Sequence, residues 1–294
     1  MDNPNTNISN QKKLRILVAE DNEINQQLIQ RILQKAGYVV DMVDNGREAV
    51  EFANRNQYDF ILMDIQMPIM EGHEAARRIR NAECRVRNKI EKDTDAGDQR
   101  PKTSGRRPVP IIALTGGDIE TEMEKCLGLG MNGCIGKPLF RDQLLSVIKI
   151  WTAAEPVGPA AGKAQKDVAT PVVKNSSAHQ PIDLDRALNE FMGEKEVLNG
   201  ILNEFTRKVR SQINAIQRAI LSLDFNEIAK EAHSIKGGAA NLTANMVAGI
   251  ASALEKAAEL KQVELAKNLA GELEEKLQQL ETYLQNANIS VIGA

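Results

Sequence analysis

The segment Asp59–Gly72 reads DFILMDIQMPIMEG, and its first half decides the fold class of the N-terminal part of the chain. Residues 59–63 form a short apolar run of the length and composition that are typical of a strand buried in a parallel sheet. Asp64 follows this run directly. Open parallel sheets place their chemistry at the carboxyl ends of the strands, so Asp64 is predicted to lie at a functional edge.

Comparable apolar runs with polar residues at their ends occur on both sides of this segment. The run at 14–19 ends at Glu20 and Asp21, the run at 109–114 at Thr115, and the short run at 133–136 at Lys137. In a parallel sheet the ends of these strands meet at one edge. We therefore expect these side chains to converge around Asp64.

Segments with helical spacing of apolar residues separate these runs. The expected strands are 14–19, 38–42, 59–63, 109–114 and 133–136, and the expected helices are 23–36, 46–54, 70–81, 119–129 and 139–151. Such alternation indicates a doubly wound α/β domain with a five-stranded parallel sheet. The predicted domain spans residues 13–151.

One segment interrupts the alternation. Residues 84–108 are charged, contain Gly and Pro, and offer almost no apolar anchors. The segment is too long for an ordinary loop between a helix and a strand. We interpret it as a mobile insertion that begins with an extension of the preceding helix, and we favour a solvated loop over an element that docks a partner.

The composition changes after residue 151. Residues 152–181 hold four prolines among many Ala, Gly, Ser and Lys residues, which is typical of a flexible linker. Residues 182–287 are rich in Ala, Leu, Glu, Lys and Gln and have no strand-like alternation. Helices are expected at 185–191, 195–222, 225–241, 245–260 and 263–286, with Asp224 and Thr243 as N-caps. This pattern predicts an all-α four-helix bundle with a short leading helix.

Composition and charge exclude several classes of protein. The 294 residues are 42% hydrophobic and carry a net charge of −3, so the sequence shows no basic footprint for nucleic acid. No run reaches the roughly 18 apolar residues of a membrane helix, and the polar start MDNPNTNISN lacks the apolar core of a signal peptide. Cys84, Cys126 and Cys134 have no CxxC spacing, so we expect a reducing, cytoplasmic compartment and no cysteine zinc site.

The residue types at the predicted strand ends suit phosphorylation of an aspartate. This reaction brings two anions together, and Mg²⁺, which prefers one or two carboxylates plus waters and phosphate oxygens, offsets their repulsion. The predicted metal ligands are Glu20, Asp21, Asp64 and the backbone carbonyl of Gln66. Asp64 is expected to be the nucleophile, because it ends the central strand. Lys137 would pair with its carboxylate, and Thr115 would donate a hydrogen bond to a phosphoryl oxygen.

Four motifs occur in order: VAEDNEINQ at 18–26, DFILMDIQMPIMEG at 59–72, PIIALTG at 110–116 and GKP at 136–138. Together they resemble the receiver domain of two-component response regulators. The resemblance covers about residues 13–151 and implies a flavodoxin-like fold with a cis peptide bond between Lys137 and Pro138. Receivers that switch an attached output usually carry Tyr or Phe three residues before the lysine, where this chain has Cys134. The departure favours a receiver that passes its phosphoryl group on.

A second candidate site lies in the predicted bundle. His233 falls in the run AHSIKGGAANL at 232–242, with Lys236 and Gly237 on the same helix face. Each of the two mid-helix glycines costs roughly 1 kcal/mol relative to alanine, which makes sense if the backbone of a partner approaches an exposed histidine. A neutral imidazole is a competent nucleophile towards an acyl phosphate, and Lys236 can neutralise the phosphoryl group.

This run resembles the signature of histidine phosphotransfer (HPt) domains. The segment ALEKAA at 253–258 resembles the facing helix of such a bundle, on which Glu255 is a candidate for orienting His233. His73 and His179 have no such context, and we interpret both as solvated bystanders.

The two resemblances together imply a phosphorelay intermediate, similar to the C-terminal part of a hybrid sensor kinase. A sensor histidine kinase would donate a phosphoryl group to Asp64, which would pass it to His233 and on to an aspartate of a downstream response regulator. This requires a linker that lets Asp64 face His233. No ATP-binding region is visible, which disfavours an ATP-dependent kinase. The alternatives are a reverse-flow phosphate sink and a phosphorylation-gated protein-binding module.

Overall fold

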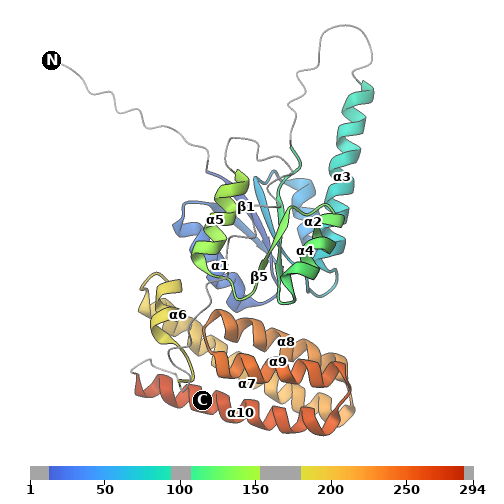
Figure 1. Cartoon of the computed structure of the whole chain (residues 1–294). Helices are drawn as coiled ribbons and strands as arrows, with labels where there is room; N and C mark the ends of the chain where they lie inside the picture. The colour runs from blue at the N-terminus through green and yellow to red at the C-terminus, as the bar shows by residue number, and fades with distance from the viewer. Residues whose placement is uncertain (1–12, 94–106, 153–179, 288–294) are drawn as a thin grey trace, which may run out of the picture.

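A five-stranded parallel sheet forms the centre of the N-terminal half of the chain (Figure 1). The computed structural model describes residues 13–93, 107–152 and 180–287. The strands are β1 (Arg15–Ala19), β2 (Val39–Val43), β3 (Phe60–Asp64), β4 (Ile111–Thr115) and β5 (Gly133–Gly136), in the order β2-β1-β3-β4-β5. Every residue of β3 and β4 is buried, which explains why both strands are continuous apolar runs.

Helices cover both faces of the sheet. The helices are α1 (Glu23–Lys35), α2 (Gly46–Arg55), α3 (Gly72–Asp93), α4 (Ile119–Gly128) and α5 (Arg141–Thr152). The buried side chains of α1 and α5 pack on one face, and those of α2, α3 and α4 pack on the other. The predicted doubly wound α/β fold with a five-stranded parallel sheet is confirmed.

Helix α3 runs well past its predicted end at residue 81. It continues to Asp93, inside the segment interpreted as an insertion, so the expected extension of this helix is confirmed. Polar contacts support it near its middle, where Arg80 Nη1 lies 2.8 Å from Glu83 Oε2 three residues along the helix. The predicted loop at residues 94–106 lies outside the described residues.

The C-terminal half is helical, as predicted. A short helix, α6 (Leu184–Glu190), leads into α7 (Lys195–Ser222), α8 (Phe225–Asn241), α9 (Asn245–Glu259) and α10 (Val263–Asn286). The last four pack as a bundle whose core holds the apolar stripe of α7 from Ile201 to Ile220. Among the described residues, no helix is both long and apolar enough to cross a membrane.

One of the two predicted N-caps is wrong. Asp224 caps α8, where its carboxylate accepts a hydrogen bond from Glu227 N at 3.1 Å. Thr243 does not cap α9, because it adopts a left-handed conformation with φ at 60° and its hydroxyl donates to Asp183 O. That conformation ends α8 instead, since it lets Ala244 N donate to Ala239 O at 2.8 Å.

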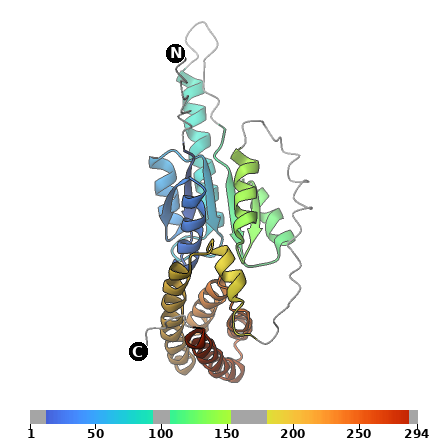
Figure 2. The ribbon, with the colours of Figure 1, turned by 90° about the vertical axis from the view of Figure 1, so that its left-hand side faces the viewer.

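The bundle docks against the α/β domain at the edge where the strands end (Figures 1 and 2). Helix α8 contacts α1 across this junction. A single cluster of buried apolar side chains continues from the α1–α5 face of the sheet into the bundle. Most of the predicted linker, residues 153–179, lies outside the described residues.

Candidate functional site

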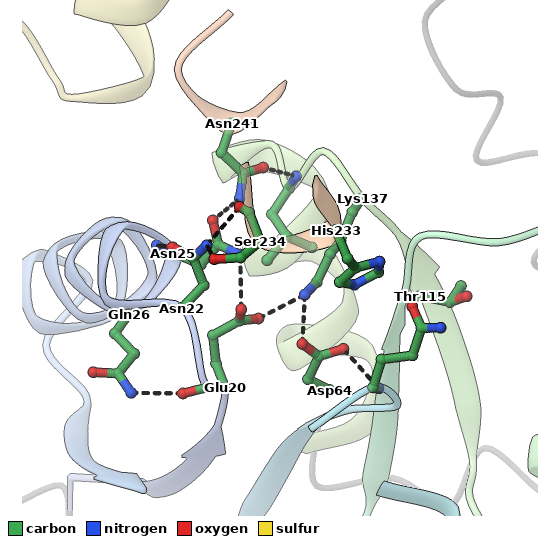
Figure 3. A network of polar contacts seen from close by, with 12 residues as sticks. Glu20, Asn22, Asn25, Gln26, Asp64, Thr115, Lys137, His233, Ser234 and Asn241 are labelled. Atoms are coloured by element: carbon green, nitrogen blue, oxygen red, sulfur yellow. Dashed lines mark hydrogen bonds and ion pairs between the residues drawn. The ribbon is translucent and has the colours of Figure 1, made fainter. Parts of the chain in front are cut away.

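Three carboxylates meet at the ends of β1 and β3, which are neighbours in the sheet. Glu20, Asp21 and Asp64 each place an oxygen so that all three atoms lie within 4.8 Å of one another. Figure 3 shows two of them, Glu20 and Asp64. Glu20 and Asp64 are buried, whereas Asp21 is exposed at the rim. The structure therefore brings together the three predicted carboxylate ligands.

Lys137 joins this cluster from the end of β5. Its Nζ lies 2.6 Å from Asp64 Oδ2 and 2.9 Å from Glu20 Oε2. Burial works against the ammonium charge, but the two carboxylates outweigh burial, and the pKa of Lys137 is raised. The following peptide bond, Lys137–Pro138, is cis, as the resemblance implied.

One lysine does not compensate the negative charge of this cluster. Burial and the neighbouring Glu20 raise the pKa of Asp64 in spite of Lys137. Partial loss of solvation at the rim, together with Glu20, also raises the pKa of Asp21. Glu20 Oε2 is buried, and its charged partner is Lys137 Nζ at 2.9 Å, which also pairs with Asp64. An oxygen-lined site with excess negative charge fits Mg²⁺, which binds through one or two carboxylates and retains waters.

The remaining predicted residues lie around Asp64. Thr115 is buried at the end of β4, and its Oγ1 accepts a hydrogen bond from Gly117 N at 3.0 Å, so the hydroxyl proton is available to an incoming oxygen. Gln66 N donates to Asp64 Oδ1 at 3.3 Å, which fixes the loop after β3 against the carboxylate.

Gly72 is a residue of this site that the sequence reasoning missed. A Cβ atom built on Gly72 would lie 2.0 Å from Asp64 O, so every larger residue would clash with the strand that carries Asp64. Gly72 N also donates to Ile65 O at 2.9 Å. The signal was present as the last residue of the segment DFILMDIQMPIMEG.

In the bundle, Glu255 holds both residues of the second candidate site. Its Oε1 lies 2.6 Å from His233 Nδ1, and its Oε2 lies 2.6 Å from Lys236 Nζ. Burial raises the pKa of Glu255, but hydrogen bonds from His233 and Lys236 outweigh burial, and the net shift is downward. An ionised Glu255 only accepts, so Nδ1 carries the proton of a neutral His233 ring and Nε2 keeps its lone pair.

The docked bundle brings the two candidate sites together. Figure 3 shows His233 of α8 at the edge of the receiver where Asp64 and Lys137 lie. A Cβ atom built on Gly116, next to Thr115, would lie 3.9 Å from His233 Cε1 and 3.8 Å from Lys236 Nζ. The histidine therefore lies at the same edge of the sheet as the acidic cluster.

Comparison with protein families matches both halves of the chain. A model of the response regulator receiver domain matches residues 16–89, and a model of the Hpt domain matches residues 200–283. The chain contains a receiver domain followed by an HPt domain. This is the domain architecture of a two-component phosphorelay protein.

Relatives of the chain include much longer kinases. Hybrid signal transduction histidine kinase B of Dictyostelium discoideum is 39% identical over 136 residues, which are 46% of this chain and 6% of that protein. Virulence sensor protein BvgS of Bordetella pertussis is 26% identical over 253 residues, which are 85% of this chain and 18% of that protein. The chain thus spans less than a fifth of the length of these two curated relatives.

A solved structure also matches the receiver half. It is the receiver domain of a sensor histidine kinase from Pseudomonas aeruginosa, described with a magnesium ion coordinated in its active site cleft. The sequence identity is 36% and the TM-score 0.38, and the match covers 48% of this chain and 98% of that chain.

Asparagines form a polar contact between the receiver and the HPt domain that the sequence reasoning missed. Asn241 Nδ2 donates to Asn25 Oδ1 at 2.7 Å, and Asn241 Oδ1 accepts from Leu139 N at 2.7 Å. Asn25 in turn donates to Glu20 Oε1 at 2.7 Å. Asn22 Nδ2 reaches Ser234 O at 2.9 Å. The network runs from the HPt helix α8 to a carboxylate of the receiver site.

Gly237 and Gly238, which follow Lys236, lie next to side chains and not next to the backbone of the receiver. A Cβ atom on Gly237 would lie 3.5 Å from Asn25 Nδ2, and one on Gly238 would lie 3.3 Å from the ring of Phe205 in the bundle itself. The neighbours of these two glycines are side chains, and the receiver backbone that comes near His233 is that of Gly116, so the need of a partner's backbone for the glycines stays a prediction. Gly238 makes room for Phe205, and Gly237 lies against the asparagine contact.

His73 is not the solvated bystander that the sequence suggested. Its side chain is only 20% exposed, and its Nε2 lies 3.5 Å from Glu122 Oε2 and 3.6 Å from Cys126 Sγ. The tertiary packing of α3 on α4 creates these contacts between residues far apart in the sequence. His179 lies outside the described residues.

Proposed function

We propose that this chain is a phosphorelay intermediate in which the receiver and the HPt domain exchange one phosphoryl group. Asp64 accepts the group from the phosphohistidine of a sensor histidine kinase, and His233 takes it from Asp64 and donates it to a downstream response regulator. One observation carries this proposal: His233 docks at the strand ends where Asp64, Lys137 and Thr115 converge.

The receiver would hold Mg²⁺ through Glu20, Asp21, Asp64 and the carbonyl of Gln66. When bound, the ion supplies positive charge that offsets the repulsion between the phosphoryl oxygens and the carboxylates. Lys137 already pairs with Asp64 and remains beside the carboxylate during transfer. The Thr115 hydroxyl, whose oxygen is fixed by Gly117 N, donates to a phosphoryl oxygen.

Transfer to the HPt domain uses the lone pair on His233 Nε2. As the bond from Nε2 to phosphorus forms, the bond from phosphorus to Asp64 breaks, and its electron pair stays on the carboxylate next to Lys137. The Nδ1 proton remains in the hydrogen bond to Glu255, which stabilises the positive charge that develops on the ring. Lys236 lies beside His233 and neutralises the phosphoryl group after transfer.

The docked arrangement suits transfer from Asp64 to His233, but it does not suit loading of Asp64 by a kinase. Helix α8 covers the strand ends, so a phosphohistidine of another protein reaches Asp64 only after the HPt domain has moved away. The proposal therefore includes an open state for loading and the docked state for transfer. The junction includes polar hydrogen bonds, such as those between Asn22 and Ser234 and between Asn241 and Asn25, beside the apolar cluster that the two domains share.

A phosphorylation-gated binding module would use the same receiver, but it would need neither the hydrogen bond between His233 and Glu255 nor the position of His233 at the strand ends. The 2.6 Å contact of Nδ1 with Glu255 leaves Nε2 as the unprotonated nitrogen of a histidine docked near the strand ends, which favours transfer over docking alone. A reverse-flow sink would use the same residues in the opposite direction, and the partners would decide the direction.

The test is intact mass spectrometry after incubation with acetyl phosphate and Mg²⁺, followed by separate acid and alkali treatment. Acyl phosphates are lost in alkali, whereas phosphohistidine survives alkali and is lost in acid. We expect an alkali-stable phosphoryl group that disappears in both Asp64→Asn and His233→Gln. An alkali-stable group that persists in Asp64→Asn, or label confined to Asp64 in the wild type, would contradict transfer within the chain.

A further inference from the structure

A second cluster of metal-ligating side chains lies on the receiver, away from the acidic cluster of Asp64. His73 at the start of α3 meets Glu122 and Cys126 of α4. These two helices pack on the sheet face opposite to α1, the helix that contacts the HPt domain. The phosphorelay proposed above uses none of the three residues.

We propose that His73, Glu122 and Cys126 bind a transition-metal ion of the zinc class through three protein ligands. One imidazole nitrogen, one carboxylate oxygen and one sulfur lie within 4.8 Å of one another. Glu122 and Cys126 are four residues apart on α4 and so share a face of the helix. Imidazole with thiolate selects zinc-like ions over Mg²⁺, which prefers oxygen ligands only.

The distances between the ligand atoms match tetrahedral coordination. Metal–ligand bonds of about 2.3 Å to sulfur and about 2.0–2.1 Å to nitrogen and oxygen place sulfur about 3.5 Å and oxygen about 3.4 Å from nitrogen. In the structure, Cys126 Sγ lies 3.6 Å and Glu122 Oε2 lies 3.5 Å from His73 Nε2. The three side chains could therefore bind an ion without a large rearrangement.

Glu122 supplies independent support for a ligand at this place. Its Oε1 accepts from Lys125 Nζ at 2.8 Å, but its Oε2 is buried and accepts no hydrogen bond. A buried carboxylate oxygen without a donor is unfavourable, and a cation next to it removes that cost. This oxygen lies 3.5 Å from His73 Nε2, so a bound ion would bridge the two atoms.

The sulfur ligand is the fully buried Cys126. Burial raises the pKa of the Cys126 thiol to about 12, so an ion must displace the thiol proton on binding. The nearby Cys134 is less suited, since its Sγ is directed to Ile119 O at 3.7 Å. Three protein ligands leave the fourth coordination position for water.

Binding at this cluster would link α3 to α4. Helix α3 begins at Gly72, which packs on the backbone of Asp64, and α4 follows the loop after Thr115. An ion bridging His73 and Cys126 would therefore restrain the two loops that follow Asp64 and Thr115 in the proposed phosphorylation site.

The experiment is titration of the full chain with Co²⁺ and then Zn²⁺, read by absorption. A thiolate-to-cobalt charge-transfer band in the near ultraviolet reports a sulfur ligand, which the oxygen-only cluster of Glu20, Asp21 and Asp64 cannot produce. We expect the band in the wild type and its loss on addition of Zn²⁺. Cys126→Ser should abolish the band, and His73→Gln and Glu122→Gln should weaken metal affinity on the order of tenfold or more.

Two cysteine variants serve as controls. Cys84→Ser, at an exposed position further along α3, and Cys134→Ser should both keep the band. Circular dichroism before metal addition checks that each variant is folded. Absence of a band in the wild type, a band that survives Cys126→Ser, or a band that depends on Cys134 would overturn the proposal.

Discussion

Glu255 holds His233 and Lys236 with one carboxylate, at 2.6 Å from His233 Nδ1 and 2.6 Å from Lys236 Nζ. The two basic side chains come from α8, and Glu255 comes from the adjacent α9. This arrangement holds the ring of His233 through Nδ1 and leaves Nε2 for the proposed phosphoryl transfer.

Neutralising Glu255 should slow phosphoryl transfer to His233. In Glu255→Gln the amide no longer stabilises the positive charge on the ring, and we expect the transfer rate to fall by about tenfold to a hundredfold. Rapid-quench measurement of transfer from phosphorylated Asp64 would give the rate. Glu259→Gln, at an exposed position on the same helix, is the matched control and should leave it unchanged.

Removing Lys236 should slow transfer without unfolding the bundle. The ammonium group neutralises the phosphoryl group, so Lys236→Ala should lower the transfer rate on the order of tenfold. Lys256→Ala removes an exposed lysine from α9 and should have no such effect. Equal rates in the two variants would remove Lys236 from the proposed site, provided that their circular dichroism spectra agree.

Asn241 should control docking of the HPt domain on the receiver. Asn241→Ala leaves Leu139 N and Asn25 Oδ1 without their partner at a buried junction, which typically costs about 1–3 kcal/mol. Intrachain transfer should slow accordingly, and amide chemical shifts around Asn25 should move towards those of the isolated receiver. Asn214 lies in a groove between α7 and α10, so Asn214→Ala should change neither the transfer rate nor the chemical shifts around Asn25.

The charge of Asp64 should destabilise the fold, increasingly so as the pH rises. Burial and then Glu20 raise the pKa of Asp64, so the folded state binds this proton more tightly than the unfolded chain. In the presence of EDTA, Asp64→Asn should therefore exceed the wild type in free energy of unfolding by about 1–3 kcal/mol near neutral pH. The difference should vanish as the pH falls towards the ordinary pKa of aspartate.

Urea unfolding across this pH range measures that difference. Asp142→Asn is the matched control, because the Asp142 side chain is 86% exposed, and it should stay within about 0.5 kcal/mol of the wild type. A stability difference for Asp64→Asn that grows as the pH falls would contradict the assigned direction of the pKa shift.

Gly72 should be intolerant of any side chain. The Cβ of Gly72→Ala would lie 2.0 Å from Asp64 O, and relieving this clash requires a backbone shift that should cost about 1–3 kcal/mol or more. Gly249→Ala is the contrasting variant, because nothing lies within 4 Å of its Cβ, and it should stabilise α9 by up to about 1 kcal/mol. Chemical denaturation of both variants measures whether the free energy of unfolding falls in Gly72→Ala and rises in Gly249→Ala.

Local patterns in the sequence were sufficient for the secondary structure and for the strand ends of the receiver. The run FILM could only be buried, so Asp64 had to stand at its end, and the same reasoning placed Glu20, Thr115 and Lys137. The amphipathic spacing of α7 likewise predicted the buried face of the bundle. Thr243 was misinterpreted because a threonine before a helix suits an N-cap and a chain reversal equally well.

Contacts between distant segments depended on the tertiary structure. The sequence around the three junction asparagines, Asn22, Asn25 and Asn241, does not indicate docking. Their side-chain amides form specific hydrogen bonds only because the other domain supplies a partner. His73 and Cys126 are separated by more than fifty residues, so their proximity could not follow from spacing along the chain. The sequence by itself determined the two folds and the chemical type of each candidate site residue, because these follow from hydrophobic periodicity and side-chain type. That His233 faces Asp64 was decided by packing between the domains, which local periodicity does not encode.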